Sequence, residues 1–114
     1  MSWITDVIIC VGLVEQYDKS FNLLEKIEPI EEVRAWLEEK DFGGLAELSS
    51  YMGTDGKAPS SLVYGGSYNH LDVEAFKEFV FNREWNDPDS VQVLLKDQEG
   101  RGYTMHSNQV ELDG

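Results

Sequence analysis

Residues 62–76 read LVYGGSYNHLDVEAF, and this stretch predicts a β-strand that turns through a polar corner into an α-helix. Its first half is rich in β-forming residues, and the paired Gly65 and Gly66 indicate a bulge or a close approach of another backbone. From Asp72 onward apolar residues recur at helical spacing, so one face of the helix is expected to be buried. Asp72 is the expected N-cap, because its carboxylate can accept hydrogen bonds from the free amides of the first turn.

The corner between this strand and helix groups an imidazole with hydrogen-bonding neighbours: Tyr68, Asn69, His70 and Asp72. A histidine with a pKa near neutrality can act as acid, base or metal ligand, and an adjacent carboxylate could orient it. In the structural alternative, His70 bridges strand and helix while Asp72 only caps the helix. The corner is therefore a candidate binding site with no catalytic residue assigned.

Segments on either side of this stretch have the period of strands or helices. A first helix is predicted from Pro29 to just before Gly43, because proline suits the first helical position and an apolar stripe follows it. Residues 15–26 show no clean period and predict a loop with at most one helical turn near Ser20. Further strands are predicted at four places, residues 3–14, 45–51, 91–95 and 101–106.

The predicted order is strand, helix, strand, strand, helix, strand, strand. Its first six elements match the split β-α-β, or ferredoxin-like, arrangement, in which two helices cover one face of an antiparallel sheet. The seventh adds a C-terminal strand. We therefore expect a single α+β domain over residues 1–114, with residues 107–114 as a mobile tail.

The charge balance is strongly acidic, with 22 Asp and Glu against 9 Lys and Arg and a net charge of -13. Such a field repels nucleic acid phosphates and anionic membranes, and it favours a basic protein as partner. Four acidic residues of the first helix form the expected partner surface: Glu31, Glu32, Glu38 and Glu39. The alternative is that this charge serves only solubility.

Signatures of catalysis or of cofactor binding are missing from the sequence. His70 and His106 have no zinc-site spacing. The serines lack a Gly-x-Ser-x-Gly elbow, and residues 65–67 lack the lysine of a phosphate loop. The sequence therefore predicts no metal, no cofactor and no catalytic residue, and it favours a protein that is not an enzyme.

Cys10 is the only cysteine, which excludes an internal disulfide, and its apolar neighbours predict a buried, inert thiol. The apolar segment of residues 7–14 is too short to span a bilayer. Asp6 stands where a signal peptide would carry positive charge. We therefore expect a cytoplasmic protein without a membrane segment.

Trp85 ends the second predicted helix. Large aromatic side chains usually cover a core, but tryptophan is also favoured at the centres of protein interfaces. Trp85 is therefore placed among the candidate binding residues, with burial in the core as the alternative.

Residues 65–72 (GGSYNHLD) and 85–97 (WNDPDSVQVLLKD) resemble segments of small, acidic, uncharacterised bacterial proteins. The resemblance covers the C-terminal half of the chain. It implies membership of such a family and brings no activity, cofactor or catalytic residue with it.

Size, charge and the lack of a catalytic signature favour a small binding protein that inhibits or regulates a basic protein, as toxin immunity proteins do. One alternative is a small enzyme or ligand-binding domain that uses the corner at residues 68–72. Another is mimicry of nucleic acid by the acidic surface. A homodimer formed through an exposed edge strand is also expected, with the fifth strand as the main candidate.

Overall fold

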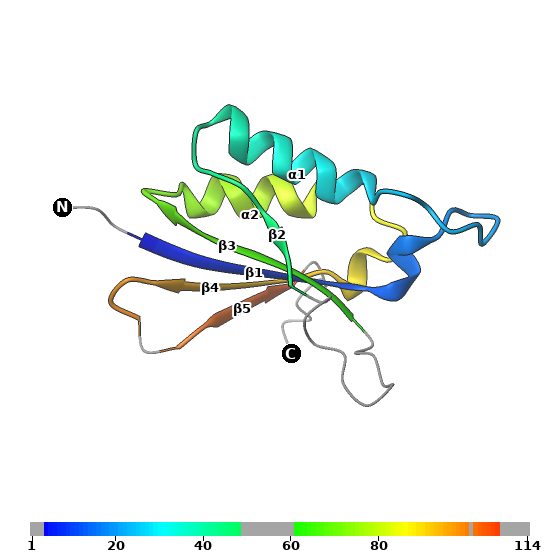
Figure 1. Cartoon of the computed structure of the whole chain (residues 1–114). Coiled ribbons are helices and arrows are strands. Elements are labelled where there is room, and N and C mark those ends of the chain that lie inside the picture. The colour runs from blue at the N-terminus through cyan, green and yellow to red at the C-terminus, as the bar shows by residue number, and fades with distance from the viewer. Residues whose placement is uncertain (1–3, 49–60, 101, 108–114) are drawn as a thin grey trace.

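The computed structural model describes residues 4–48, 61–100 and 102–107. Among the described residues, two 3-10 helices accompany the α-helices and strands, whose arrangement is drawn in Figure 1. In chain order the elements are β1 (Ile4–Gly12), η1 (Leu13–Gln16), α1 (Glu28–Glu39), β2 (Ala46–Glu47), β3 (Ser61–Asn69), α2 (Val73–Phe81), η3 (Pro88–Ser90), β4 (Gln92–Asp97) and β5 (Thr104–Ser107).

The strands form one five-stranded sheet in the order β2-β3-β1-β4-β5, and every neighbouring pair is antiparallel. Both helices lie on the same side of this sheet (Figure 1). The predicted α+β class with an antiparallel sheet and two helices is therefore confirmed. Of the seven residues predicted for the second strand, two form β2, and residues 49–51 lie outside the described part.

Burial alternates strictly along β1, because the helices cover only one face of the sheet. Val7, Ile9 and Val11 are at most 1% exposed and point to the helix side, whereas the residues between them are only partly buried. Period-two burial of this kind is expected of a strand with one face in the core. Helix side chains complete the core from above, namely Ile30, Val33 and Leu37 of α1 and Phe76 and Val80 of α2.

The ends of the helices follow local chemistry. The side chain of Asp72 accepts a hydrogen bond from the Ala75 amide at 3.1 Å, which confirms the predicted N-cap of α2. Helix α1 has its proline in the first turn and ends at Glu39, because Asp41 then takes a left-handed φ of 61°. The tail predicted from residue 107 onward lies outside the described residues apart from Ser107, which ends β5.

Over the described ranges, neither α1 nor α2 has the length and apolar character that a membrane-spanning helix requires.

Candidate functional site

Within the predicted corner, Tyr68 points into the core. It is 1% exposed, and its hydroxyl donates a hydrogen bond to the Gly44 carbonyl at 2.8 Å. Burial raises the pKa of Tyr68 to about 12, although the nearby Arg34 guanidinium acts in the opposite direction. A Cβ at Gly66 would lie 2.4 Å from the Tyr68 hydroxyl oxygen, so the glycine makes room for the ring. The tyrosine therefore fastens β3 to the segment after α1.

The remaining corner residues stay near solvent. Asn69 and His70 are exposed, and His70 makes the turn out of β3 with a left-handed φ of 54°. Asp72 is occupied in capping α2. The structure thus separates buried Tyr68 from exposed His70, and the role of this corner in binding stays a prediction.

Trp85 is 7% exposed, and its indole Nε1 donates a hydrogen bond to the Val80 carbonyl at 2.8 Å. A satisfied indole N–H is typical of a buried tryptophan. This placement fits the core alternative that the sequence left open.

The acidic residues predicted on α1 differ in their surroundings. Glu31 forms an ion pair with Arg34, which lies one turn further along α1. The Glu32 carboxylate lies 3.6 Å from the guanidinium of Arg83, in the segment after α2. Glu38 and Glu39 are exposed near the other end of α1. The acidic face is therefore partly neutralised at one end and free of these pairings at the other.

Two further titratable side chains, His106 and Cys10, are partly buried. The Nε2 atom of His106 lies 3.2 Å from the Thr104 hydroxyl oxygen, and partial burial, with nearby Lys77, lowers the pKa of His106. Cys10 is half-buried on the sheet face away from the helices, and burial raises the pKa of its thiol. Little Cys10 thiolate is expected at neutral pH, which fits an inert thiol.

Residues 13–28, which we call the tip, project at the end of the molecule where β1 runs into α1 (Figure 1). The tip opens with η1 and continues into a closed loop in which Tyr17 pairs with Leu23. The Leu24 amide donates to the Gln16 carbonyl at 2.7 Å, and the Asp18 amide donates to the Asn22 carbonyl at 2.9 Å. Sequence periodicity predicted only a loop here, whereas the structure shows a hydrogen-bonded one.

Asp18 organises the turn at the end of the tip. Its carboxylate accepts from the amides of Ser20 at 2.8 Å and Asn22 at 2.9 Å, and the Asn22 side chain donates to it as well. These hydrogen bonds, with the Asn22 amide first, lower the pKa of Asp18. Between them Phe21 adopts a left-handed φ of 62°, which is uncommon for a bulky residue.

Glu15 anchors the tip to the body of the protein. Its carboxylate is 2% exposed and accepts hydrogen bonds from the backbone amides of Asn86 at 2.9 Å and Asp87 at 2.7 Å. The Asn86 side chain donates in return to the carbonyls of Tyr17 at 2.6 Å and Val14 at 3.1 Å. Two segments 71 positions apart are thereby joined by four hydrogen bonds.

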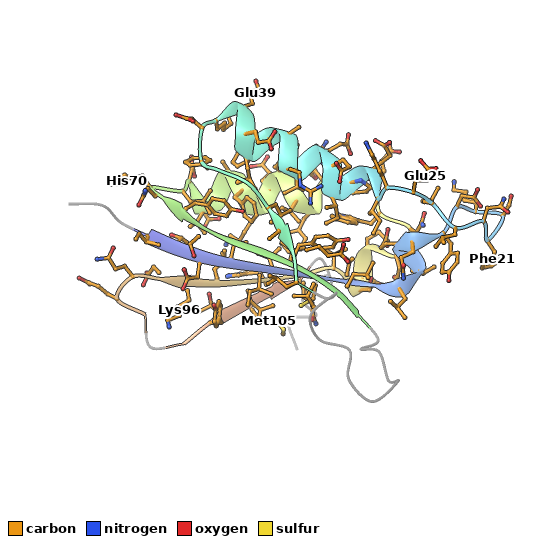
Figure 2. All side chains as sticks on the ribbon, in the orientation of Figure 1. Phe21, Glu25, Glu39, His70, Lys96 and Met105 are labelled. Atoms are coloured by element: carbon orange, nitrogen blue, oxygen red, sulfur yellow. The ribbon has the colours of Figure 1, made fainter. Side chains whose placement is uncertain are left out.

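Large apolar side chains are unusually exposed along the tip. Phe21 is 80% and Leu23 68% exposed, and four more are exposed by 37% to 42%: Leu13, Val14, Tyr17 and Leu24. Figure 2 shows Phe21 at the outermost loop, at the opposite end of the molecule from His70. Soluble proteins seldom expose apolar groups in such a concentration unless the surface binds something.

A groove of about 560 Å³ runs between the tip, the start of α1 and the segment after α2. Five carboxylates and two lysines line it: Glu15, Asp18, Glu25, Glu28, Glu84, Lys19 and Lys26. The formal balance of these side chains is negative. The tip therefore combines an apolar end with an acidic flank.

Sequence reasoning missed this site for a physical reason. The tip has no period, and its order depends on Asn86 and Asp87, which are distant in sequence. A usable signal was present in the density of large apolar residues over residues 13–24, which a solvated loop does not need.

The chain matches no protein-family model, no curated protein and no solved structure.

Proposed function

We propose that this protein binds a basic protein through the tip and thereby inhibits or regulates it. One observation supports this proposal above the others: Phe21 is 80% exposed on a loop that Asp18, Glu15 and Asn86 hold in one conformation. A flexible loop could turn such a side chain inward, whereas a fixed loop keeps it in water until a partner covers it.

The energetics favour an interface at this place. Covering a phenylalanine or leucine side chain contributes about 1.5–3 kcal/mol. A loop already ordered before binding avoids the entropic cost of fixing it, so more of that free energy appears as affinity. Aromatic anchors near the centre of a contact surface typically dominate its binding energy.

Charge supports a basic partner. Glu25 of the tip and Glu84 of the segment after α2 both line the groove, and both are exposed. A net charge of -13 steers a basic protein toward the molecule and repels acidic competitors. Charge then sets the rate of encounter, and the apolar end of the tip sets the lifetime of the complex.

We further propose that the fold is the ferredoxin-like one with an added strand. In its support, β1 lies between β3 and β4, β2 flanks β3, all pairings are antiparallel, and both helices lie on one face. β5 extends the sheet beyond β4 and forms its edge. A homodimer through this edge, and a cytoplasmic location, stay predictions.

The alternative of an enzyme or ligand-binding site at residues 68–72 has less support. The Tyr68 hydroxyl is engaged with Gly44, and Asp72 caps α2. Mimicry of nucleic acid by the acidic surface shares the basic partner with our proposal. It differs in requiring that DNA compete for the same partner surface.

The test is an affinity capture from an extract of the source organism, followed by titration of the purified captured protein. Two tip variants are compared with the unmodified protein: Phe21→Ser with Leu23→Ser, and Glu25→Lys with Glu84→Lys. The matched control, Glu38→Lys with Glu39→Lys, makes the same change of charge at the far end of α1. All these side chains are exposed, so the variants are expected to fold.

We expect one basic protein to bind the unmodified chain and the control, with affinity reduced about tenfold or more in each tip variant. Rising salt should weaken binding, because exposed opposite charges are screened. Binding that is lost in the control and kept in the tip variants would move the interface to α1. Competition by DNA would favour mimicry, and failure to retain any basic protein would refute the proposal.

A further inference from the structure

The sheet face opposite the helices, which we call the open face, is the second concentration of partly exposed apolar side chains. The strand pairing places Ile8 between Gly65 and Leu94 on this face. Cys10 lies beside Val63, and Met105 lies next to Leu94. In the described part of the chain, both helices pack on the other side (Figure 1). Figure 2 shows Met105 and Lys96 below the sheet, away from α1 and α2.

A shallow hollow of about 300 Å³ lies in this face. Ile8 and Gly65 line it together with Leu48 and with Tyr103, which is 44% exposed. A Cβ at Gly65 would lie 2.9 Å from the Leu48 Cδ1 atom, so the glycine lets Leu48 lie close over the sheet. Met105, 61% exposed, stands next to Leu94 on the same face. The face thus carries both a hollow and a protruding side chain.

Charge distinguishes the open face from the rest of the molecule. Its described strand positions carry one acid and one base, Asp6 and Lys96, which are cross-strand neighbours. The Ser67 hydroxyl donates to the Asp6 carboxylate at 2.6 Å, and Lys96 Nζ lies 5.9 Å from the centroid of the Tyr103 ring. Over its described strand positions this face therefore has no net charge, in a chain of net charge -13, and these positions lack the acidic excess that attracts a basic protein. The open face suits a surface that also carries one acidic and one basic side chain, and the same face of a second copy is such a surface.

We propose that the open face is a two-fold symmetric interface between two copies of this chain. The symmetry brings Asp6 of each copy toward Lys96 of the other, and it sets Met105 of one copy against the hollow of the other. With strands about 4.8 Å apart and about six residues long, the face measures roughly 500 Å² per copy. Such an area is at the low end for specific interfaces, so dissociation in the micromolar range is expected.

The test is sedimentation velocity of the full chain from low micromolar to millimolar concentration. We expect a reversible monomer–dimer equilibrium that strengthens with salt, because salt screens the repulsion between two chains of net charge -13. This salt dependence is opposite in sign to that of a basic partner bound at the tip. The two proposals can therefore fail independently.

Leu94→Glu and Met105→Glu should each weaken dimerisation about tenfold or more, because each places a charge in the interface. The control Phe21→Glu introduces the same charge at an exposed apolar position on the tip and should leave the dimer unchanged. Circular dichroism verifies that each variant is folded.

A charge exchange tests the symmetry itself. Asp6→Lys alone and Lys96→Asp alone should each weaken the dimer, and the two changes together should restore it, because the pairs across the two-fold are then re-formed. A chain that stays monomeric at millimolar concentration would overturn the proposal. So would dimers that persist in the Leu94 and Met105 variants, which would point to the β5 edge, or dimers abolished by Phe21→Glu.

Discussion

The Glu15 carboxylate and the backbone amide of Asn86 meet at 2.9 Å, although the two residues are 71 positions apart in sequence. The contact is partly buried, and the second carboxylate oxygen accepts from the Asp87 amide at 2.7 Å. It makes the order of the tip dependent on the segment after α2. A local loop without such a contact would be ordered only by its own few hydrogen bonds.

Replacing Glu15 with Gln should lower the free energy of unfolding by about 1–3 kcal/mol, because the new amide N–H₂ would face the Asp87 N–H and leave a partly buried donor unpaired. Urea denaturation followed by tryptophan fluorescence measures this change. The control Glu25→Gln alters an exposed carboxylate and should stay within about 0.5 kcal/mol of the unmodified protein. Equal stability of the two variants would show that the Glu15 contact contributes nothing.

Gly66→Ala should destabilise the protein by about 1–3 kcal/mol, the usual effect of overpacking a core. The added methyl group would lie 2.4 Å from the Tyr68 hydroxyl oxygen and 3.1 Å from the Gly44 carbonyl oxygen, so the ring must move. Gly44→Ala is the matched control, because a Cβ there has nothing within 4 Å and the backbone carbonyl that Tyr68 uses is retained. Thermal unfolding of both variants decides the matter, and a Gly66→Ala protein as stable as the control would contradict this packing.

Tyr64 and Tyr68 should titrate about two pH units later than an ordinary tyrosine, since burial raises the pKa of each to about 12. The raised value means that folding favours the neutral phenol. The stabilising contribution is therefore complete below about pH 10 and is lost as the pH rises through 12. Ultraviolet absorbance of the phenolate, recorded with circular dichroism, would show a step near pH 12 while the protein is still folded. A single step near pH 10 in the folded protein would exclude this assignment.

The turn at the end of the tip should resist acid. The pKa of Asp18 is lowered by hydrogen bonds that favour its charged form, so its contribution to order is complete above the ordinary aspartate pKa of about 3.9. It is lost as the pH falls through the lower, folded value. Amide chemical shifts of Ser20 and Asn22 should report that midpoint, and Asp18→Ala should remove the transition. A midpoint at or above the ordinary value would be inconsistent with the two amide contacts.

Local patterns in the sequence predicted most of the fold. The apolar run around Ile9 indicates a strand, the helical stripe around Phe76 identifies the buried face of α2, and the Asp72 cap marks the start of that helix. These features depend on neighbours a few residues away. The extent of β2 could not be predicted in this way, because Ala46 and Glu47 form their strand by pairing with Gly65 and Tyr64.

The candidate site also has one property that the sequence predicts and one that depends on contacts between distant segments. The sequence identified the acidic character of the surface, which is additive over residues and needs no structure. It placed the partner surface on α1 and did not foresee the tip, since the position of Phe21 is fixed by Glu15 and Asn86 together. Contacts between distant segments produce no hydrophobic periodicity in either segment, so they are found only from the three-dimensional structure.

The central place of β1 in the sheet has a consequence for synthesis of the chain. β1 is translated before both of its neighbours in the sheet, β3 and β4, which begin at residues 61 and 92. β1 therefore stays unpaired until β3 and β4 have been translated, and pairings of such long sequence separation fold slowly. Nascent chains of this protein are expected to engage chaperones at β1, and the tip becomes ordered only after Asn86 and Asp87 have been translated.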